Sequence, residues 1–362
     1  MTTLLTIKRS GEPPYPLAID GTHFAEPGPD VTKEIDTSSW WAVPGLADAH
    51  AHLTMQTPRD IHGVTEDQML TNIPAMAWAQ VDRGVLLILD KGGATDITLL
   101  SLDLAPDVRP FVEVAGALIH PAGGYVSGFG AEVEPDDLVE HIRTRAVTRG
   151  GWVKIVGDWP RKGEGPKNNY SLERLIEAVG VAHAAGAKVA VHSMANSASD
   201  AVAAGVDSIE HGPFLTHEDL RILAARGGAW VPTVVNMLDV LAFLGPDSSG
   251  GKLFAKGLER MRENLPLAEE LGVTVLAGTD MAVPHGEVAV EAMRLKEYGM
   301  SDQAAADAAT VAAYRYIGRS DRLQPGDAAD VVFFADDPHA DVATLSRPKL
   351  IIRNGSIVGP RP

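Results

Sequence analysis

The feature that most limits the fold of this chain is an alternation of short apolar segments with alanine-rich, helix-like segments. Apolar segments of strand length recur eight times between residues 46 and 280. They cover 46–52, 84–90, 108–116, 152–157, 188–193, 208–212, 229–235 and 273–280. Apolar strands that alternate with helices are typical of a parallel sheet covered by helices, and eight such units indicate a closed (β/α)8 barrel, the TIM-barrel fold.

Capping residues predict where two of the intervening helices begin. Ser171 precedes a helix expected to run to His183, and Thr216 precedes a helix expected over 218–225. A last helical region is expected over 302–317. These segments have the length and polarity of helices that cover the outside of a barrel.

The two ends of the chain differ from the barrel segment and resemble each other. Glycine and proline interrupt residues 1–44, which predicts short strands and turns there. Residues 331–334 form a further predicted strand, and 349–358 are expected to form two strands around an Asn354-Gly355 turn. We therefore predict a small β-sandwich domain built from residues 1–44 and 321–362, with the barrel occupying residues 45–320.

Composition excludes several classes of partner. The net charge of −17 argues against nucleic acid or an anionic membrane surface, which both require a basic face. The sequence has no cysteine, so a metal site would use nitrogen and oxygen ligands only. Neither a signal-peptide pattern nor an apolar run of membrane-spanning length is evident, so we expect a cytoplasmic protein that acts on a small molecule.

Polar residues gather at the ends of the predicted strands, where barrel enzymes place their active sites. His50 and His52 end the first apolar segment, and their i, i+2 spacing places both imidazoles on one face of a strand. The other polar residues at or near strand ends are Asp90, Lys154, His192, His211 and Asp280. Each alone has an ordinary structural explanation, but together they predict a metal site.

Lys154 is the most unusual of these residues, because it lies inside the apolar segment Trp152-Val153-Lys154-Ile155-Val156. A buried ammonium without a partner is unfavourable, so such a lysine tends to become neutral. A neutral amine can take up carbon dioxide to form a carbamate, whose oxygens are able to bridge two cations.

These motifs resemble the metal-dependent amidohydrolase superfamily. PGLADAHAH is similar to its first-strand pattern PGxxDxHxH, and VKIVG resembles the strand that contains its carboxylated lysine. VAVH, DSIEHG and LAGTD look like its fifth, sixth and eighth strands, and GDAADVVFFADDP resembles its return to the β-sandwich. GVDSIEHG, WVPTVV and GGATD are most similar to the imidazolonepropionase-like and Xaa-Pro dipeptidase-like (prolidase-type) branch.

The resemblance implies a binuclear metal centre. It assigns His50, His52 and Asp280 to one divalent ion, and His192 and His211 to a second, with zinc the first expectation. Lys154, as N6-carboxylysine, would bridge the two ions together with a hydroxide. The implied reaction is attack of that hydroxide on an amide, with Asp280 as general base and acid.

Substrate contacts are expected from loops that follow the strands. Some members of the branch have Gly-Gly-His after the third strand, where this chain has Gly123-Gly124-Tyr125. They often have an arginine before the second-strand aspartate, where this chain has Leu89-Asp90. These departures put a plain dipeptide specificity in doubt. The candidate substrate-binding residues are Tyr125, Trp159, Arg161, Lys162 and His285.

Several functions remain open at this stage. An N-acyl amino acid or dipeptide is the first expectation, and cyclic amides, lactones and organophosphate esters would suit the same site. A mononuclear deaminase would not need Lys154 as a bridge, and a noncatalytic scaffold would not need all six ligands. A homo-oligomer is possible, and the sequence does not fix the number of subunits.

Overall fold

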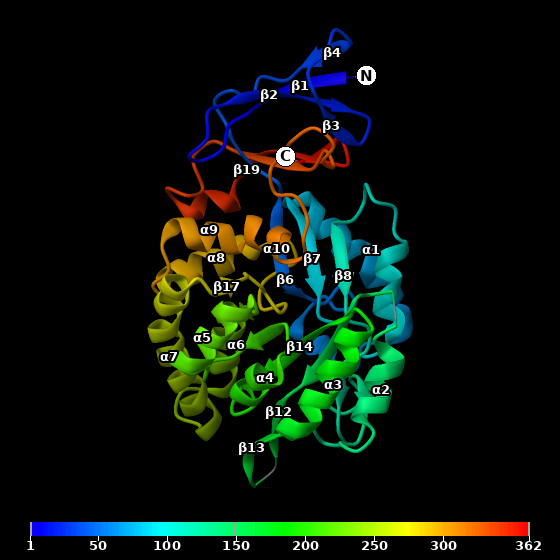
Figure 1. Ribbon diagram of the computed structural model, residues 1–362, viewed down its shortest axis with the longest axis vertical. Coiled ribbons are helices and arrows are strands. Elements are labelled where there is room, and N and C mark those ends of the chain that lie inside the picture. The colour runs from blue at the N-terminus through cyan, green and yellow to red at the C-terminus, as the bar shows by residue number, and fades with distance from the viewer. Residues whose placement is uncertain (1, 148, 162, 361–362) are drawn as a thin grey trace.

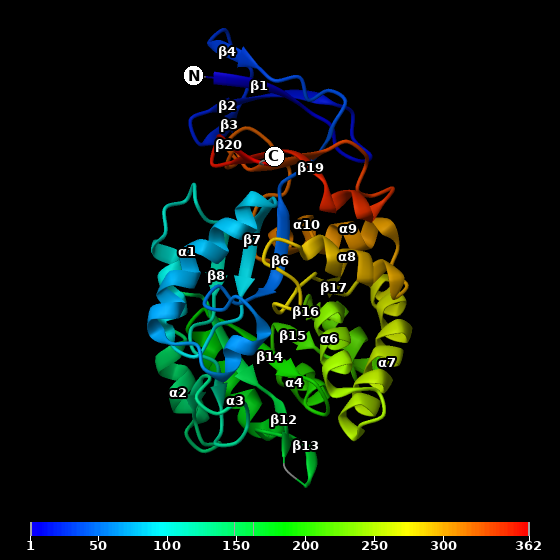
Figure 2. The ribbon, with the colours of Figure 1, turned by 180° about the vertical axis from the view of Figure 1, so that it is seen from behind.

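The computed structural model describes residues 2–147, 149–161 and 163–360. A helix-covered barrel forms most of the chain, and two small sheets built from both chain ends lie against one side of it (Figure 1). The same arrangement seen from behind shows the hairpin β12 (Asp158–Arg161) and β13 (Gly165–Asn168) at the opposite end of the molecule from these sheets (Figure 2).

The eight predicted barrel strands are present. They are β6 (Leu46–Ala51), β7 (Val85–Asp90), β8 (Phe111–Val114), β11 (Trp152–Val156), β14 (Lys188–Ser193), β15 (Ser208–His211), β16 (Ala229–Val231) and β17 (Thr274–Val275). Neighbouring strands pair in parallel, in the orders β6-β7-β8 and β11-β14-β15-β16-β17. A bridge between Val114 and Gly151 joins the two groups, and the Ala49 N–H donates to the Ala277 carbonyl at 2.8 Å, which closes the barrel.

Helices follow the strands and cover the outside of the barrel. They are α1 (Glu66–Asp82), α2 (Leu138–Arg145), α3 (Leu172–Ala184), α4 (Ala198–Ala204), α5 (His217–Arg226), α6 (Val234–Leu244), α7 (Ser249–Leu271), α8 (Val288–Glu297), α9 (Asp302–Ala308) and α10 (Val311–Tyr316). The predicted caps are confirmed: the Ser171 hydroxyl accepts from the Arg174 N–H, and the Thr216 hydroxyl accepts from the Asp219 N–H. Short 3-10 helices occupy Pro58–His62, Asp96–Asp103 and Val342–Ser346.

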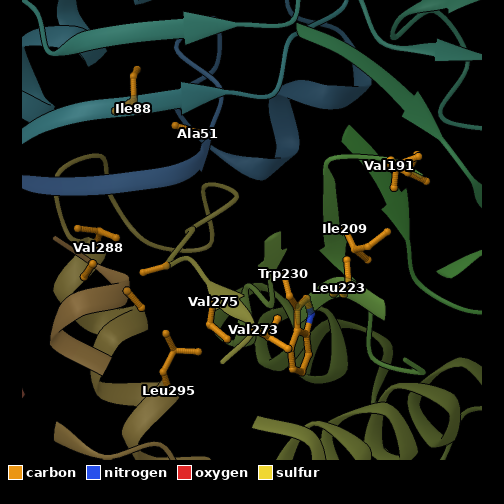
Figure 3. Close-up of a cluster of buried hydrophobic side chains, with 14 of the residues drawn as sticks. Ala51, Ile88, Val191, Ile209, Leu223, Trp230, Val273, Val275, Val288 and Leu295 are labelled. Atoms are coloured by element: carbon orange, nitrogen blue, oxygen red, sulfur yellow. The ribbon is translucent and has the colours of Figure 1, made fainter. Parts of the chain in front are cut away.

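Alternation along the strands decides which side chains reach the barrel interior. Val153 and Ile155 of β11 pack outward in the cluster between strands and helices, part of which Figure 3 shows with Ile209 of β15 and Leu223 of α5. Trp152 belongs to the inner cluster, so Lys154, two residues further, also points inward. The alternation of side chains along the strands therefore directs a few polar side chains into the barrel interior at one end.

The sheets outside the barrel use both chain ends, as predicted for the fold class. One has the order β3-β2-β1-β4, with bounds His23–Ala25, Tyr15–Asp20, Thr2–Ile7 and Val31–Glu34. The other has the order β20-β19-β18-β5, with bounds Ser356–Gly359, Pro348–Arg353, Val331–Phe334 and Trp41–Val43. Apolar residues of both sheets, including Leu17 and Phe333, form one cluster between them. The exact domain boundaries proposed above stay predictions.

The Asn354-Gly355 turn between β19 and β20 is present, with positive φ at both residues. Gly355 is required by space as well as by φ, because a Cβ at this position would lie 2.0 Å from the Gly21 carbonyl oxygen. This turn therefore also fixes the approach of one small sheet to the other.

Three predicted elements differ from the structure. The strand expected over 229–235 ends at Val231, because the buried Glu291 carboxylate accepts from the Val234 and Val235 N–H groups and caps α6. The helix expected over 302–317 divides at Thr310, whose φ of −135° and ψ of −100° are not helical. The eighth strand has regular pairing only at Thr274–Val275, and its later residues bond to β6 individually.

Candidate metal centre

The structure brings the predicted imidazoles and Asp280 together at one end of the barrel. Asp280 Oδ1 lies 3.1 Å from His52 Nε2 and 3.4 Å from His50 Nε2. Its other oxygen, Oδ2, lies 3.8 Å from His211 Nε2, and His211 Nε2 lies 3.1 Å from His192 Nδ1. All four imidazoles are buried. Among the described residues, His50, His211 and Asp280 each offer one ligand atom within 4.8 Å of the other two, so the assignment of these residues to two separate ions stays a prediction.

Hydrogen bonds fix which nitrogen of two histidines faces the cluster. His52 Nδ1 donates to the Gly92 carbonyl at 2.6 Å, so in the neutral imidazole Nε2 has the lone pair. The Thr233 hydroxyl donates to the Pro232 carbonyl at 2.8 Å, so its oxygen accepts from His211 Nδ1 at 2.6 Å. Both rings therefore present Nε2 as an acceptor, which is the arrangement that outer hydrogen bonds give to metal-binding histidines.

The spacing of these atoms suits shared cations. Nitrogen ligands about 2.0–2.1 Å from a tetrahedral zinc lie about 3.3 Å from one another. His192 Nδ1 and His211 Nε2 are 3.1 Å apart, and the two contacts of Asp280 Oδ1 are 3.1 and 3.4 Å. The residues present therefore fit divalent metal ions held by nitrogen and oxygen.

Two buried polar atoms at this cluster, Lys154 Nζ and His192 Nε2, have no hydrogen-bond partner among the described residues. Buried polar groups normally have partners, so two such atoms beside one cluster favour a site that is completed by a ligand. Lys154 is 1% exposed and its amine has no hydrogen-bond partner in the described chain, as its predicted bridging role requires.

Burial favours the neutral form of three of the imidazoles, whereas the neighbouring Asp280 raises the pKa of the fourth, His52, against the effect of burial. Burial holds the pKa of His50 and His211 well below the ordinary value and lowers the pKa of His192 to about 4. Burial also lowers the pKa of Lys154 to about 8, which raises the fraction of neutral amine well above that of an exposed lysine. For Asp280, burial raises the pKa, but the neighbouring His50 and His52 outweigh it, so the carboxylate pKa lies below its ordinary value.

Backbone geometry aims the side chains of β6, β15 and the eighth strand. His211, Thr233 and Asp280 have positive φ values of 63°, 49° and 46°, which non-glycine residues rarely adopt. A Cβ at Gly278 would lie 2.6 Å from the His50 Cβ, so only glycine allows the eighth strand this close to β6. The fold thus holds strained backbone at two cluster residues, His211 and Asp280, and at Thr233, which orients His211.

The predicted substrate-side residues are distributed unevenly. The Tyr125 ring contacts the Trp159 ring edge-on at a centroid distance of 4.5 Å and lies 5.5 Å from the His192 ring. Arg161 is the last residue of β12, next to the turn of the β12–β13 hairpin, and it donates to Asn169 Oδ1 and to the Ala122 carbonyl. Tyr125 and Trp159 therefore form one wall beside His192, and Arg161 contacts the loop that precedes Tyr125.

His285 lies apart from this wall. Its Nε2 donates to the Met55 carbonyl at 2.9 Å, and its Nδ1 accepts from the Gln80 amide at 3.2 Å. With both ring nitrogens engaged, His285 supports the loop after β6, and a substrate contact for it stays a prediction. Lys162 lies outside the described residues.

Sequence reasoning missed several residues that support the cluster. Asp48 accepts from the Thr279 hydroxyl at 2.7 Å and from the His50 N–H at 3.1 Å, which ties the eighth strand to β6. Asp158 binds the loop after His192, and Thr233 orients His211. Glu210 and Lys91 form a buried ion pair under the cluster. A charged residue inside an apolar strand was a signal for Glu210, as it was for Lys154.

Comparison with known proteins agrees with this geometry. The model of the amidohydrolase family matches residues 41–358, which is most of the chain. The chain belongs to the amidohydrolase family. It is therefore an enzyme of a family that hydrolyses carbon–nitrogen bonds, and the predicted resemblance is confirmed.

Relatives and solved structures cover nearly the whole length of this amidohydrolase. An uncharacterized protein of Mycobacterium bovis is 33% identical over 357 residues, which are 94% of this chain and 91% of the relative. A Xaa-Pro dipeptidase solved with bound methionine has a TM-score of 0.81 at 21% identity, covering 99% of both chains. Ochratoxinase of A. niger also has a TM-score of 0.81, at 18% identity, covering 98% of this chain and 95% of that one. These structures share the fold.

Proposed function

We propose that this amidohydrolase is a binuclear metal enzyme that cleaves the amide bond of an N-acyl amino acid or dipeptide, next to a free carboxylate. The observation that carries the proposal is the convergence of four buried imidazoles and Asp280 beside an amine, Lys154 Nζ, that has no hydrogen-bond partner in the described chain. A mononuclear deaminase would leave that amine without a role.

The proposed metal ligands are those expected from the sequence. His50, His52 and Asp280 would hold one ion, His192 and His211 the other, and carboxylated Lys154 would bridge them. Bound divalent cations, most simply zinc, would lower the pKa of a water molecule and polarise the scissile carbonyl.

Residues of the chain would then transfer the protons and orient the substrate. Asp280 accepts the proton of the attacking water and returns it to the leaving nitrogen as the carbon–nitrogen bond breaks, giving a carboxylate and an amine. Its lowered pKa keeps Asp280 ionised and ready to accept that proton. Tyr125, whose hydroxyl makes no hydrogen bond to a described residue and whose ring lies beside His192, would donate to the carbonyl oxygen that gains negative charge.

Recognition of a carboxylate is supported by the charge of Arg161. Both hydrogen-bond acceptors of its guanidinium, Asn169 Oδ1 and the Ala122 carbonyl, are neutral. In a chain of net charge −17, a guanidinium that forms no salt bridge with a described carboxylate, and that Glu164 affects only through its charge, is available to an anionic substrate group. The adjacent faces of Trp159 and Tyr125 suit an apolar or aromatic acyl group.

The experiment measures amine release from a panel of N-acyl amino acids and dipeptides by zinc-loaded enzyme, with the α-amides of the same compounds as neutral counterparts. We expect hydrolysis of the acids in preference to the amides. Asp280→Asn should lower kcat by about a hundredfold or more, as loss of a general base does. The exposed Asp239→Asn serves as the matched control and should retain full activity. Equal rates for acids and amides, or an active Asp280→Asn, would contradict the proposal.

A further inference from the structure

Two buried charged residues, Lys91 and Glu210, have no role in the proposed reaction. Lys91 follows β7, and Glu210 precedes His211 on β15; neither exposes more than 1% of its surface. Lys91 Nζ lies 3.0 Å from Glu210 Oε1, and the Ser208 hydroxyl donates to the same oxygen at 2.6 Å. One oxygen of Glu210 is therefore held from two sides.

The other oxygen of Glu210 faces a predicted metal ligand. Oε2 lies 2.8 Å from His50 Nδ1, and neither atom has an aligned hydrogen bond to any described residue. A carboxylate oxygen can only accept, so its proximity places the imidazole proton on Nδ1. His50 Nε2, 3.4 Å from Asp280 Oδ1, then keeps the lone pair that a metal requires.

We propose that Glu210 is a positioning residue that sets the tautomer and ring orientation of His50, and that Lys91 anchors Glu210 for this purpose. The inference rests on the proposed function, because it assumes that His50 binds a metal. A carboxylate behind a histidine raises its basicity as a ligand, and removing such a partner weakens metal binding about 10- to 100-fold.

The position of Lys91 also explains why the Lys154 amine forms no ion pair with Glu210. Both lysines point into the barrel near Glu210, but Lys91 makes the 3.0 Å ion pair, while Lys154 Nζ has no hydrogen-bond partner among the described residues. The stacked Trp152 ring, 4.6 Å from Lys91 Nζ, further holds Lys91 in place. Lys91 thus forms the ion pair with Glu210, and the Lys154 amine stays available to the metal cluster.

The competing explanation is that the pair only neutralises two buried charges. A buried pair can often be replaced by uncharged residues with little loss of stability, whereas removal of one partner is strongly destabilising. The variants Glu210→Gln, Lys91→Met and the double variant therefore separate the two explanations. Two quantities are measured on chelator-treated protein: the free energy of unfolding, and the affinity for Zn²⁺ alone in competition with a chromophoric chelator.

We expect Glu210→Gln to weaken zinc binding at one of two sites at least tenfold, and the double variant to recover stability without recovering that affinity. Recovery of both in the double variant, or wild-type zinc affinity in Glu210→Gln, would overturn the positioning role. Wild-type protein that binds no zinc would instead overturn the proposed function. The buried pair Arg353 and Asp330 in the small sheets is the matched control, because Arg353→Met with Asp330→Asn should leave zinc affinity unchanged.

Discussion

Asp158 provides the sharpest test of how the structure supports the cluster. Its buried carboxylate accepts five hydrogen bonds from the loop that follows His192: from the Ser193 hydroxyl at 3.0 Å, the Met194 N–H at 3.0 Å, the Ala195 N–H at 3.1 Å, and the Ser197 N–H and hydroxyl at 2.9 and 2.7 Å. Four of these bonds go to Oδ2 and one, from Met194, goes to Oδ1. A single side chain thus organises the turn after β14.

The change Asp158→Asn preserves shape but removes one acceptor. If the amide oxygen takes the place of Oδ2, the amide nitrogen faces the Met194 N–H, and one buried donor left without an acceptor costs about 2 kcal/mol. The four remaining bonds lose their charge assistance, and about 0.5 kcal/mol for each adds about 2 kcal/mol more. We therefore expect the free energy of unfolding to fall by about 4 kcal/mol.

The assay is urea unfolding of metal-free protein, which separates this effect from metal binding. The exposed Asp239→Asn on α6 controls for loss of one carboxylate and should change the free energy of unfolding by less than about 0.5 kcal/mol. A loss below about 1 kcal/mol in Asp158→Asn would refute the argument that all five bonds are made, four of them buried and the Met194 bond half-buried.

Three further predictions address other residues. Thr233→Val removes the acceptor of His211 Nδ1, so zinc affinity in chelator competition should fall about tenfold; an unchanged affinity would show that Thr233 does not orient the ring. Burial raises the pKa of Glu291 from 4.5 to about 8. Relative to Glu291→Gln, the free energy of unfolding of the wild type should therefore fall by about 1.4 kcal/mol per pH unit as the pH rises between these values. Parallel profiles of unfolding free energy against pH would contradict this. Arg161→Met should raise KM for carboxylate substrates at least about tenfold with kcat retained, and an equal rise for the neutral amides would argue against carboxylate recognition.

The sequence predicted the barrel and the positions of its polar residues because both depend on local patterns. The i, i+2 spacing of His50 and His52 and the lysine inside an apolar strand are features of single strands. Their convergence follows from the fold, since the carboxyl ends of parallel strands meet at one end of a barrel. Even the inward direction of Lys154 follows from its position two residues after Trp152.

Features that depend on distant residues were not predicted. Val234 and Val235 have strand-like side chains, yet they begin a helix because Glu291, 57 and 56 residues away, caps it. The ion pair of Lys91 with Glu210 joins the end of β7 to β15, and the residue pattern within either strand does not predict it. The contact of Trp159 with Tyr125 likewise joins loops after different strands.

The central claim is a bridged pair of metal ions at the cluster, and metal content per chain tests it most directly. Elemental analysis of protein purified without chelator is compared for the wild type and Lys154→Ala. The account predicts about two divalent ions per chain in the wild type, with both metal and hydrolytic activity lost in the variant. One ion or none in the wild type, with Lys154→Ala unchanged in metal content and activity, would contradict it.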